Sequence, residues 1–146
     1  MLSPDDLYQK VSRCERLTTE DALELALRGN FITLAQLAKE HSKKENGQRN
    51  EQHKTATIAF DARTSWPGYF KELQKLRDAQ DELPLYFSFL PNAVSLTGHE
   101  YLRLIAITRL FLDNFEHIET PDSLHNSKIA EIALHFGASP RYDQAS

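Results

Sequence analysis

The first 42 residues carry their apolar side chains at helical spacing, in three short runs. Ser3-Pro4 is a typical helix start, because serine caps the first turn and proline is tolerated at the first helical position. Thr18 and Asp21 have the spacing of a capping box and predict a second helix, which Gly29 ends. A third apolar run follows directly. The pattern therefore predicts a compact helical N-terminal unit over residues 1–42.

A polar segment follows from residue 43 to residue 54, with no apolar side chain and with Gly47 near its middle. Segments of this composition are typical of exposed connections between structured parts of a chain. We therefore expect residues 43–54 to link the helical unit to a second, separately patterned part of the protein.

Beyond the linker, short runs of β-forming residues alternate with amphipathic helical runs. The predicted strands cover residues 55–60, 85–90 and 115–119, and the predicted helices cover residues 65–79, 98–112 and 122–136. The first two strand runs are almost unbroken in apolar or small residues, which is typical of strands buried on both faces. The order βαβαβα predicts an α/β fold with a parallel sheet over residues 55–139, followed by a tail at 140–146.

Composition and charge narrow the class of protein. The chain has 146 residues, of which 40% are hydrophobic and 26% charged, as in an ordinary globular protein. Its net charge of −4 argues against nucleic acid and anionic membranes as main partners. No apolar run is long enough to span a bilayer, and the acidic N-terminus does not resemble a secretory signal. We therefore expect a cytoplasmic protein that binds neither nucleic acid nor membranes.

None of the polar side chains forms a recognisable catalytic or metal-binding pattern. The six histidines stand at positions 41, 53, 99, 117, 125 and 135. This spacing favours solvated or helix-terminal roles over a metal site. Arg103 and Arg109 lie on the long apolar helix, with Asp113-Asn114 just beyond it. The two arginines could clamp an anion at the C-terminal ends of the strands, but snorkelling side chains near a helix-end carboxylate are the preferred interpretation.

Two further positions bear on chemistry. Cys14 is the single cysteine, so the chain has no intramolecular disulfide, and its place on a short helix favours a buried thiol over a reactive one. Asp61 directly follows the first predicted strand, where α/β proteins place catalytic groups, but a lone carboxylate defines no reaction. The glycines are scattered along the chain, so no phosphate-binding loop is predicted.

Several runs of the sequence match one family of enzymes. The most specific are Leu-Arg-Asp-Ala-Gln-Asp-Glu at 76–82, Phe-Ser-Phe-Leu-Pro at 87–91, Arg-Leu-Phe-Leu-Asp-Asn at 109–114 and Ile-Ala-Leu-His-Phe-Gly-Ala at 132–138. With residues 16–38, these runs resemble the radical S-adenosylmethionine (radical SAM) enzymes of the futalosine route to menaquinone. Cyclic dehypoxanthine futalosine synthase is the best match, and aminofutalosine synthase and the deazaflavin (FO) synthases are related. The resemblance implies a partial (β/α) barrel of about three parallel βα units, since a closed barrel needs roughly 250 residues.

The resemblance breaks at the part of the family's sequence that binds its cofactors. After Arg49-Asn50 the family continues into a Cys-x3-Cys-x2-Cys motif for a [4Fe–4S] cluster that binds S-adenosylmethionine. This chain instead has Glu51-Gln52-His53 and rejoins the family pattern at its first strand, as though an internal block were missing. The residues after that strand, 61–65, differ as well. Because catalysis in barrels depends on such loops, we expect no catalytic, cofactor-binding or metal-binding residues, and no cofactor, in this chain.

Three functional hypotheses are compatible with these patterns. The chain is a truncated, non-catalytic relative of the menaquinone-pathway enzymes (a pseudoenzyme), one half of a split enzyme completed by a partner chain, or a small α/β protein-interaction module. Three parallel strands leave two sheet edges with unpaired backbone groups, and the long helix is apolar nearly all round. We therefore expect a homo-oligomer or a complex with a partner protein.

Overall fold

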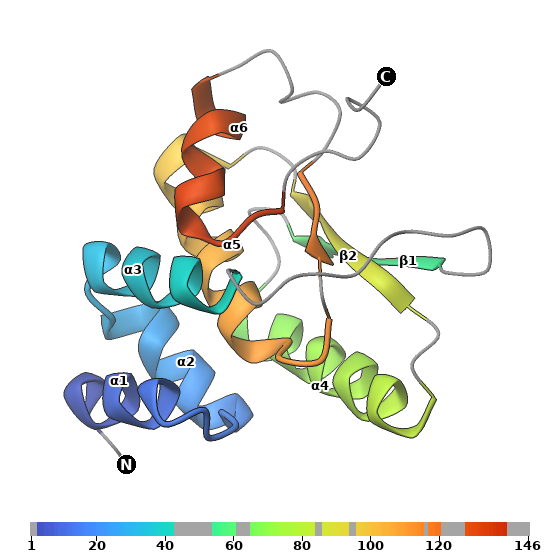
Figure 1. Ribbon diagram of the computed structural model, residues 1–146, viewed down its shortest axis with the longest axis horizontal. Helices are drawn as coiled ribbons and strands as arrows, with labels where there is room; N and C mark the ends of the chain where they lie inside the picture. The colour runs from blue at the N-terminus through green and yellow to red at the C-terminus, as the bar shows by residue number, and fades with distance from the viewer. Residues whose placement is uncertain are drawn as a thin grey trace.

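The computed structural model describes residues 3–42, 54–60, 65–83, 86–93, 96–115, 117–120 and 128–139. The elements, drawn in Figure 1, are α1 (Pro4–Ser12), α2 (Thr19–Arg28), α3 (Phe31–Ser42), β1 (Lys54–Phe60), α4 (Trp66–Glu82), β2 (Tyr86–Ala93), α5 (Gly98–Phe111), β3 (His117–Ile118), α6 (Lys128–Ala133) and the 3₁₀ helix η2 (Leu134–Phe136). The start predicted for the last helix, most of the polar linker and the tail lie outside the described residues. None of the helices in these ranges has the length and apolar composition that a membrane span needs.

Local signals in the sequence set the starts of the helices. Ser3 and Thr18 cap α1 and α2 in complete capping boxes, and Thr97 begins α5 in the same way. Asn30 caps α3, where its Oδ1 accepts a hydrogen bond from the Thr33 N–H at 3.0 Å. Each cap satisfies backbone N–H groups that a helix leaves unpaired in its first turn. The helix starts predicted from Ser3 and Thr18 are confirmed.

The three strands form one parallel sheet in the order β1-β2-β3, which confirms the predicted α/β class for this part of the chain. β1 pairs with β2 along its whole length, whereas β3 is shorter than predicted and pairs only with Ser88 and Phe89 of β2. The sequence predicts that Pro91 ends β2, and this is wrong, because the strand continues to Ala93. At Pro91 the strand has one described neighbour instead of two. Proline has no backbone N–H to donate, and its absence is tolerated where one side of the strand is not paired.

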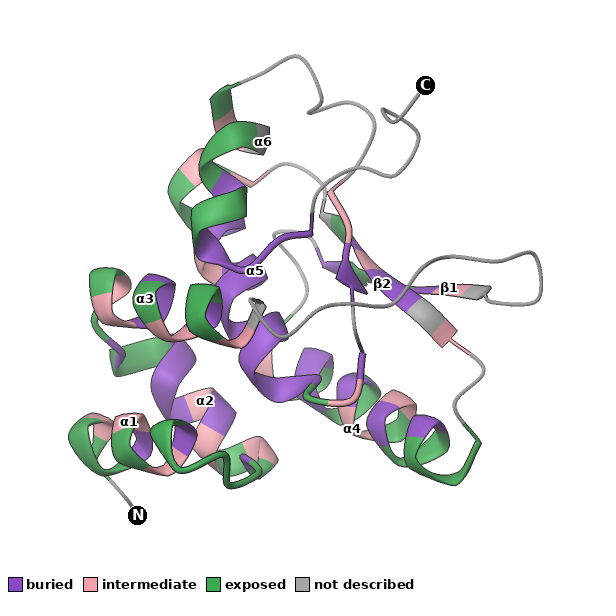
Figure 2. Ribbon diagram, viewed as in Figure 1, coloured by how far each residue is buried: buried purple, intermediate pink, exposed green. Residues whose placement is uncertain are grey.

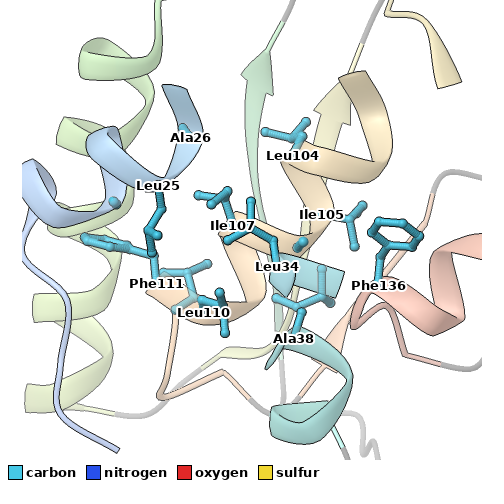
Figure 3. Packing of buried hydrophobic residues seen from close by; sticks show 14 of the residues in the cluster. Leu25, Ala26, Leu34, Ala38, Leu104, Ile105, Ile107, Leu110, Phe111 and Phe136 are labelled. Carbon is cyan, nitrogen blue, oxygen red and sulfur yellow. The ribbon is translucent and has the colours of Figure 1, made fainter. Parts of the chain in front are cut away.

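Helix α5 lies at the centre of the hydrophobic core. All its residues from 104 to 111 are buried, and Figure 2 shows it between the sheet and the N-terminal helices. Leu25 of α2, Leu34 and Ala38 of α3 and Phe136 of η2 pack around it (Figure 3). The sequence predicts that this helix needs a cover for its excess apolar surface. Helices α2 and α3 of the same chain provide that cover.

The two faces of the sheet differ in how far they are covered. Ala56, Phe60 and Phe89 are buried, whereas Thr57 and Ala59, which alternate with them along β1, are exposed. Successive side chains of a strand point to opposite faces, so the second face of β1 has no described helix packed on it. The sequence predicts a strand buried on both faces, and for β1 this is wrong.

The outer edge of β3 is occupied by a later part of the chain. The Ser139 N–H donates a hydrogen bond to the Ile118 carbonyl at 2.7 Å, and the Ser139 hydroxyl accepts one from the Ile118 N–H at 2.9 Å. The residues after η2 therefore take the next position in the sheet. Among the described residues β1 and β3 are therefore both edge strands, as the sequence predicts, but the outer edge of β3 is hydrogen-bonded to Ser139, whereas that of β1 has no strand neighbour.

Two buried tyrosines on α4 and α5 differ in their hydrogen bonding. The Tyr69 hydroxyl lies 2.7 Å from the Thr108 hydroxyl. The Tyr101 hydroxyl has no hydrogen-bond partner among the described residues, although only 4% of the residue's surface is exposed. Burial raises the pKa of both phenols above the ordinary value, so each keeps its proton at neutral pH.

Replacing each tyrosine by phenylalanine should have opposite consequences. Tyr69→Phe leaves the buried Thr108 hydroxyl without its partner, and we expect the free energy of unfolding to fall by about 1 kcal/mol. Tyr101→Phe removes a buried polar group that makes no hydrogen bond, so stability should stay the same or rise. Urea denaturation followed by circular dichroism measures both variants. A larger loss for Tyr101→Phe than for Tyr69→Phe would contradict this interpretation.

Candidate functional site

Arg103 belongs to α5, and its side chain contacts the C-terminal end of α2 and not the ends of the strands. Its Nη1 donates hydrogen bonds to the carbonyls of Leu25, Ala26 and Gly29 at 3.4, 3.2 and 3.0 Å. The guanidinium also lies over the Phe31 ring, 5.9 Å from the ring centre, and burial lowers the pKa of this arginine. Carbonyls at the end of a helix carry partial negative charge. Arg103 therefore caps α2.

Arg109 is buried, with 4% of its surface exposed, and joins three segments of the chain. Its Nε donates to the Gly137 carbonyl at 2.8 Å and its Nη1 to the Phe115 carbonyl at 3.4 Å. Its Nη2 donates to the Ser139 hydroxyl at 3.0 Å. Because that hydroxyl also accepts the Ile118 N–H, Arg109 fixes the segment that pairs with the outer edge of β3.

These contacts distinguish the two interpretations of the arginine pair. Arg103 and Arg109 both donate to oxygens of this chain, so the structural role preferred from the sequence is supported over an anion clamp. The detail of that prediction is wrong for Arg109. A snorkelling side chain carries its charge to solvent, whereas the Arg109 guanidinium is held inside the protein, because three oxygen acceptors are available to it there.

A second polar cluster joins segments that lie far apart in the sequence. Arg16, from the turn between α1 and α2, donates to both carboxylate oxygens of Asp81 at 2.6 and 3.0 Å and to both of Asp113 at 2.7 and 2.8 Å. The Asn114 amide donates to Asp81 Oδ1 and to the Arg77 carbonyl, each at 2.8 Å. We call these five residues the basal cluster, because α4 and α5 end here before leading into the N-terminal ends of β2 and β3.

The basal cluster matches two cations with two acidic side chains. The hydrogen bond from Arg16 holds the pKa of the Asp81 carboxyl below its usual range, and the bonds to Asp113 and Asp81 raise the pKa of Arg16. Burial lowers the pKa of Arg77, whose Nη1 donates to the Phe111 carbonyl at 3.1 Å. The Arg77 guanidinium also lies 4.1 Å from the centre of the Phe111 ring. The charged side chains of the cluster therefore pair with one another, and the cluster also contacts main-chain carbonyls and the Phe111 ring.

Gln80 connects the basal cluster to the start of β2. Its Nε2 donates to the carbonyls of Tyr86 and Asn114 at 2.7 and 3.2 Å, and its Oε1 accepts from the Tyr86 N–H at 3.1 Å. The family-like runs at 76–82 and 109–114 thus meet at the N-terminal ends of the strands. Parallel sheets and barrels bind their ligands at the opposite, C-terminal ends. In the described part of the chain, these residues hold the fold together.

On the face of the sheet to which the exposed Thr57 and Ala59 belong, side chains from β1, from β2 and from the residue that follows β3 meet. The hydroxyl oxygens of Thr55 and Ser88 lie 3.0 Å apart, and the Thr55 hydroxyl donates to Glu119 Oε2 at 3.2 Å. The Ser88 hydroxyl donates to the same oxygen. His117, opposite Ser88 in the strand register, is buried. Ser88 is fully buried, so it is not placed as an accessible nucleophile.

The sequence motifs do not predict this Thr55–Ser88–Glu119 group. A signal for it exists, since threonines alternate with apolar residues at positions 55 to 58, which is the period of a strand with one polar face. Because the run at 55–60 is short and consists of small and β-forming residues, the same sequence also fits a strand buried on both faces. As chemistry, the group is a carboxylate that accepts hydrogen bonds from two hydroxyls.

Other candidate residues have different outcomes. Cys14 is exposed, so the predicted buried thiol is wrong: the residue lies beyond the end of α1, in a turn with a φ of 60°. Histidines 41, 99 and 135 lie in or near helix ends, as predicted, but His117 lies buried in β3. Asp61 and histidines 53 and 125 lie outside the described residues. Within the ranges that the structure describes, no group of three metal-ligating side chains occurs.

Part of the chain is similar in sequence to known enzymes. No protein-family model matches the chain. The chain is 37% identical over 100 residues to the 5-amino-6-(D-ribitylamino)uracil–L-tyrosine 4-hydroxyphenyl transferase of Methanoculleus marisnigri, covering 58% of this chain and 27% of that enzyme. It is 33% identical over 79 residues to the cyclic dehypoxanthine futalosine synthase of Streptomyces coelicolor, covering 47% and 20%. It is 30% identical over 82 residues to the aminodeoxyfutalosine synthase of Thermus thermophilus, covering 46% and 22%.

The described sheet and helices are of the α/β class, and the sequence matches show a relationship to radical SAM enzymes over part of the chain. The predicted resemblance to the enzymes of the futalosine pathway is confirmed, because two of the three relatives are named as futalosine or aminodeoxyfutalosine synthases. The matched part of this chain spans between a fifth and about a quarter of the length of the three relatives.

Proposed function

We propose that this chain is a relative of the futalosine-pathway radical SAM enzymes that retains part of their barrel as a scaffold and does not catalyse their reaction on its own. The basal cluster is the observation that carries the proposal. Asp81, Asn114 and Arg77 belong to the most family-like runs, and they bind backbone groups and one another at the N-terminal ends of the strands. Barrel enzymes place their chemistry at the opposite ends. The similarity in these runs therefore concerns architecture.

The supply of thiolates supports the same proposal. Iron–sulfur clusters are held by several cysteine thiolates, and the chain has one cysteine. Cys14 stands in the exposed turn after α1, far in the sequence from the position where the family carries its Cys-x3-Cys-x2-Cys motif. One thiolate cannot replace the three of that motif.

Anaerobic reconstitution with iron and sulfide tests this proposal. We expect no stoichiometric iron or sulfide to remain with the purified chain, and no 5′-deoxyadenosine after addition of S-adenosylmethionine and a reductant, because a single thiolate does not hold a cluster. A relative with the complete cysteine motif, treated in parallel, is the positive control. A bound cluster together with 5′-deoxyadenosine formation by this chain alone would overturn the proposal.

A second candidate function is that of one half of a split enzyme, and the unpaired edge of β1 supports it. The outer edge of β1 pairs with no described strand. Lys54 at its start is the one charged residue of the strand, and residues 55–60 contain neither a charge nor a proline that would keep another strand away. A partner chain with further parallel strands could continue the sheet from this edge. A neighbouring reading frame that encodes Cys-x3-Cys-x2-Cys distinguishes the candidates, since its product should copurify with this chain and bring iron into the complex. A stable complex with a protein without that motif would favour the interaction module.

We also propose that the isolated chain self-associates through the edge of β1. Two copies related by a twofold axis would place their β1 strands side by side and satisfy the backbone groups of both edges. Analytical ultracentrifugation at micromolar concentration should then give a dimer. Ala59→Lys, which places a charge on the exposed side of this strand, should restore the monomer, whereas Ala59→Ser should not. A monomer at every concentration would refute self-association.

A further inference from the structure

We draw no further inference here: the strongest candidate, the open face of the sheet where Thr57 and Ala59 are exposed beside the Thr55–Ser88–Glu119 group, carries none because nothing in the structure shows what covers it.

Discussion

Replacing Arg109 by methionine should lower the free energy of unfolding by about 3 kcal/mol, because buried acceptors of a charged donor would be left unsatisfied. Methionine keeps most of the volume of the side chain but cannot donate to the carbonyls of Gly137 and Phe115 or to the Ser139 hydroxyl. The loss should extend to the sheet, since the Ser139 hydroxyl also binds the Ile118 N–H of β3.

Urea denaturation of the Arg109 variant, followed by circular dichroism, measures this loss. Arg28→Met is the matched control, because Arg28 is largely exposed and its ion pair with Glu24 has a distance of 3.6 Å. The Glu24 side chain is buried, but the contact is long and the Arg28 side chain lies largely in solvent, so the control should lose at most about 1 kcal/mol. Arg109→Lys should lie between the two, since an ammonium group cannot reproduce the fork of a guanidinium. Equal stability of Arg109→Met and Arg28→Met would mean that the buried contacts contribute nothing net.

The second large effect is expected at Gly137, which ends η2 with a φ of 99°. L-residues with a side chain are strained in this region, at a cost of about 1–2 kcal/mol. A Cβ at this position would also lie 3.0 Å from both the Ala38 Cβ and the Arg109 Cγ. We therefore expect Gly137→Ala to lower the free energy of unfolding by about 2 kcal/mol or more.

Gly68→Ala is the control for the backbone argument. Gly68 lies in the first turn of α4, where a Cβ would meet only the Ser65 Oγ at 3.3 Å. Alanine favours helices over glycine by about 0.5–1 kcal/mol, so this variant should be as stable as the parent or more stable. Thermal unfolding of the two variants compares them directly. The two arguments at Gly137, left-handed backbone and close contact, both fail if its variant unfolds at the same temperature as the Gly68 variant.

The sequence predicts the helix starts well because their signals are local. Ser3, Thr18 and Thr97 each act on backbone groups within three residues, and the order of helices and strands depends on similar short-range patterns. The parallel sheet could also be predicted, since βαβ connections constrain how neighbouring strands pair. The helix starts need no contact between distant segments, whereas the strands pair across about 30 residues, and the connections limit how they can do so.

The hydrogen-bond partners of Arg103 and Arg109 could not be predicted from the sequence. Arg103 and Arg109 bind mostly main-chain carbonyls, and every residue has a carbonyl, so residue types do not reveal such partners. The segments that cover the apolar surface of α5 could not be predicted either. Its apolar surface shows that a cover exists, but the choice between α2 and α3 and a second chain depends on the tertiary fold.

The exposed thiol and the open sheet face show two limits of pattern reading. The sequence predicts Cys14 on the first helix, but that helix ends at Ser12, and the exact end of a helix is hard to predict because helix ends fray. The strand at 55–60 contains small residues on both faces, so a run that is apolar in composition has threonine and alanine exposed on one side. Threonine has a high β-propensity at both buried and exposed positions.

The contacts of Arg109 impose an order on events while the chain is being synthesised. Helices α2 and α3 leave the ribosome before α5, so the apolar surface of α5 can be covered as soon as it emerges. Two acceptors of the Arg109 guanidinium, Gly137 and Ser139, follow 28 and 30 residues later. During that interval a nascent chain carries a cation whose native site does not yet exist. The helical part can therefore form cotranslationally, whereas the edge of the sheet beyond β3 is completed only after residue 139 has been released from the exit tunnel.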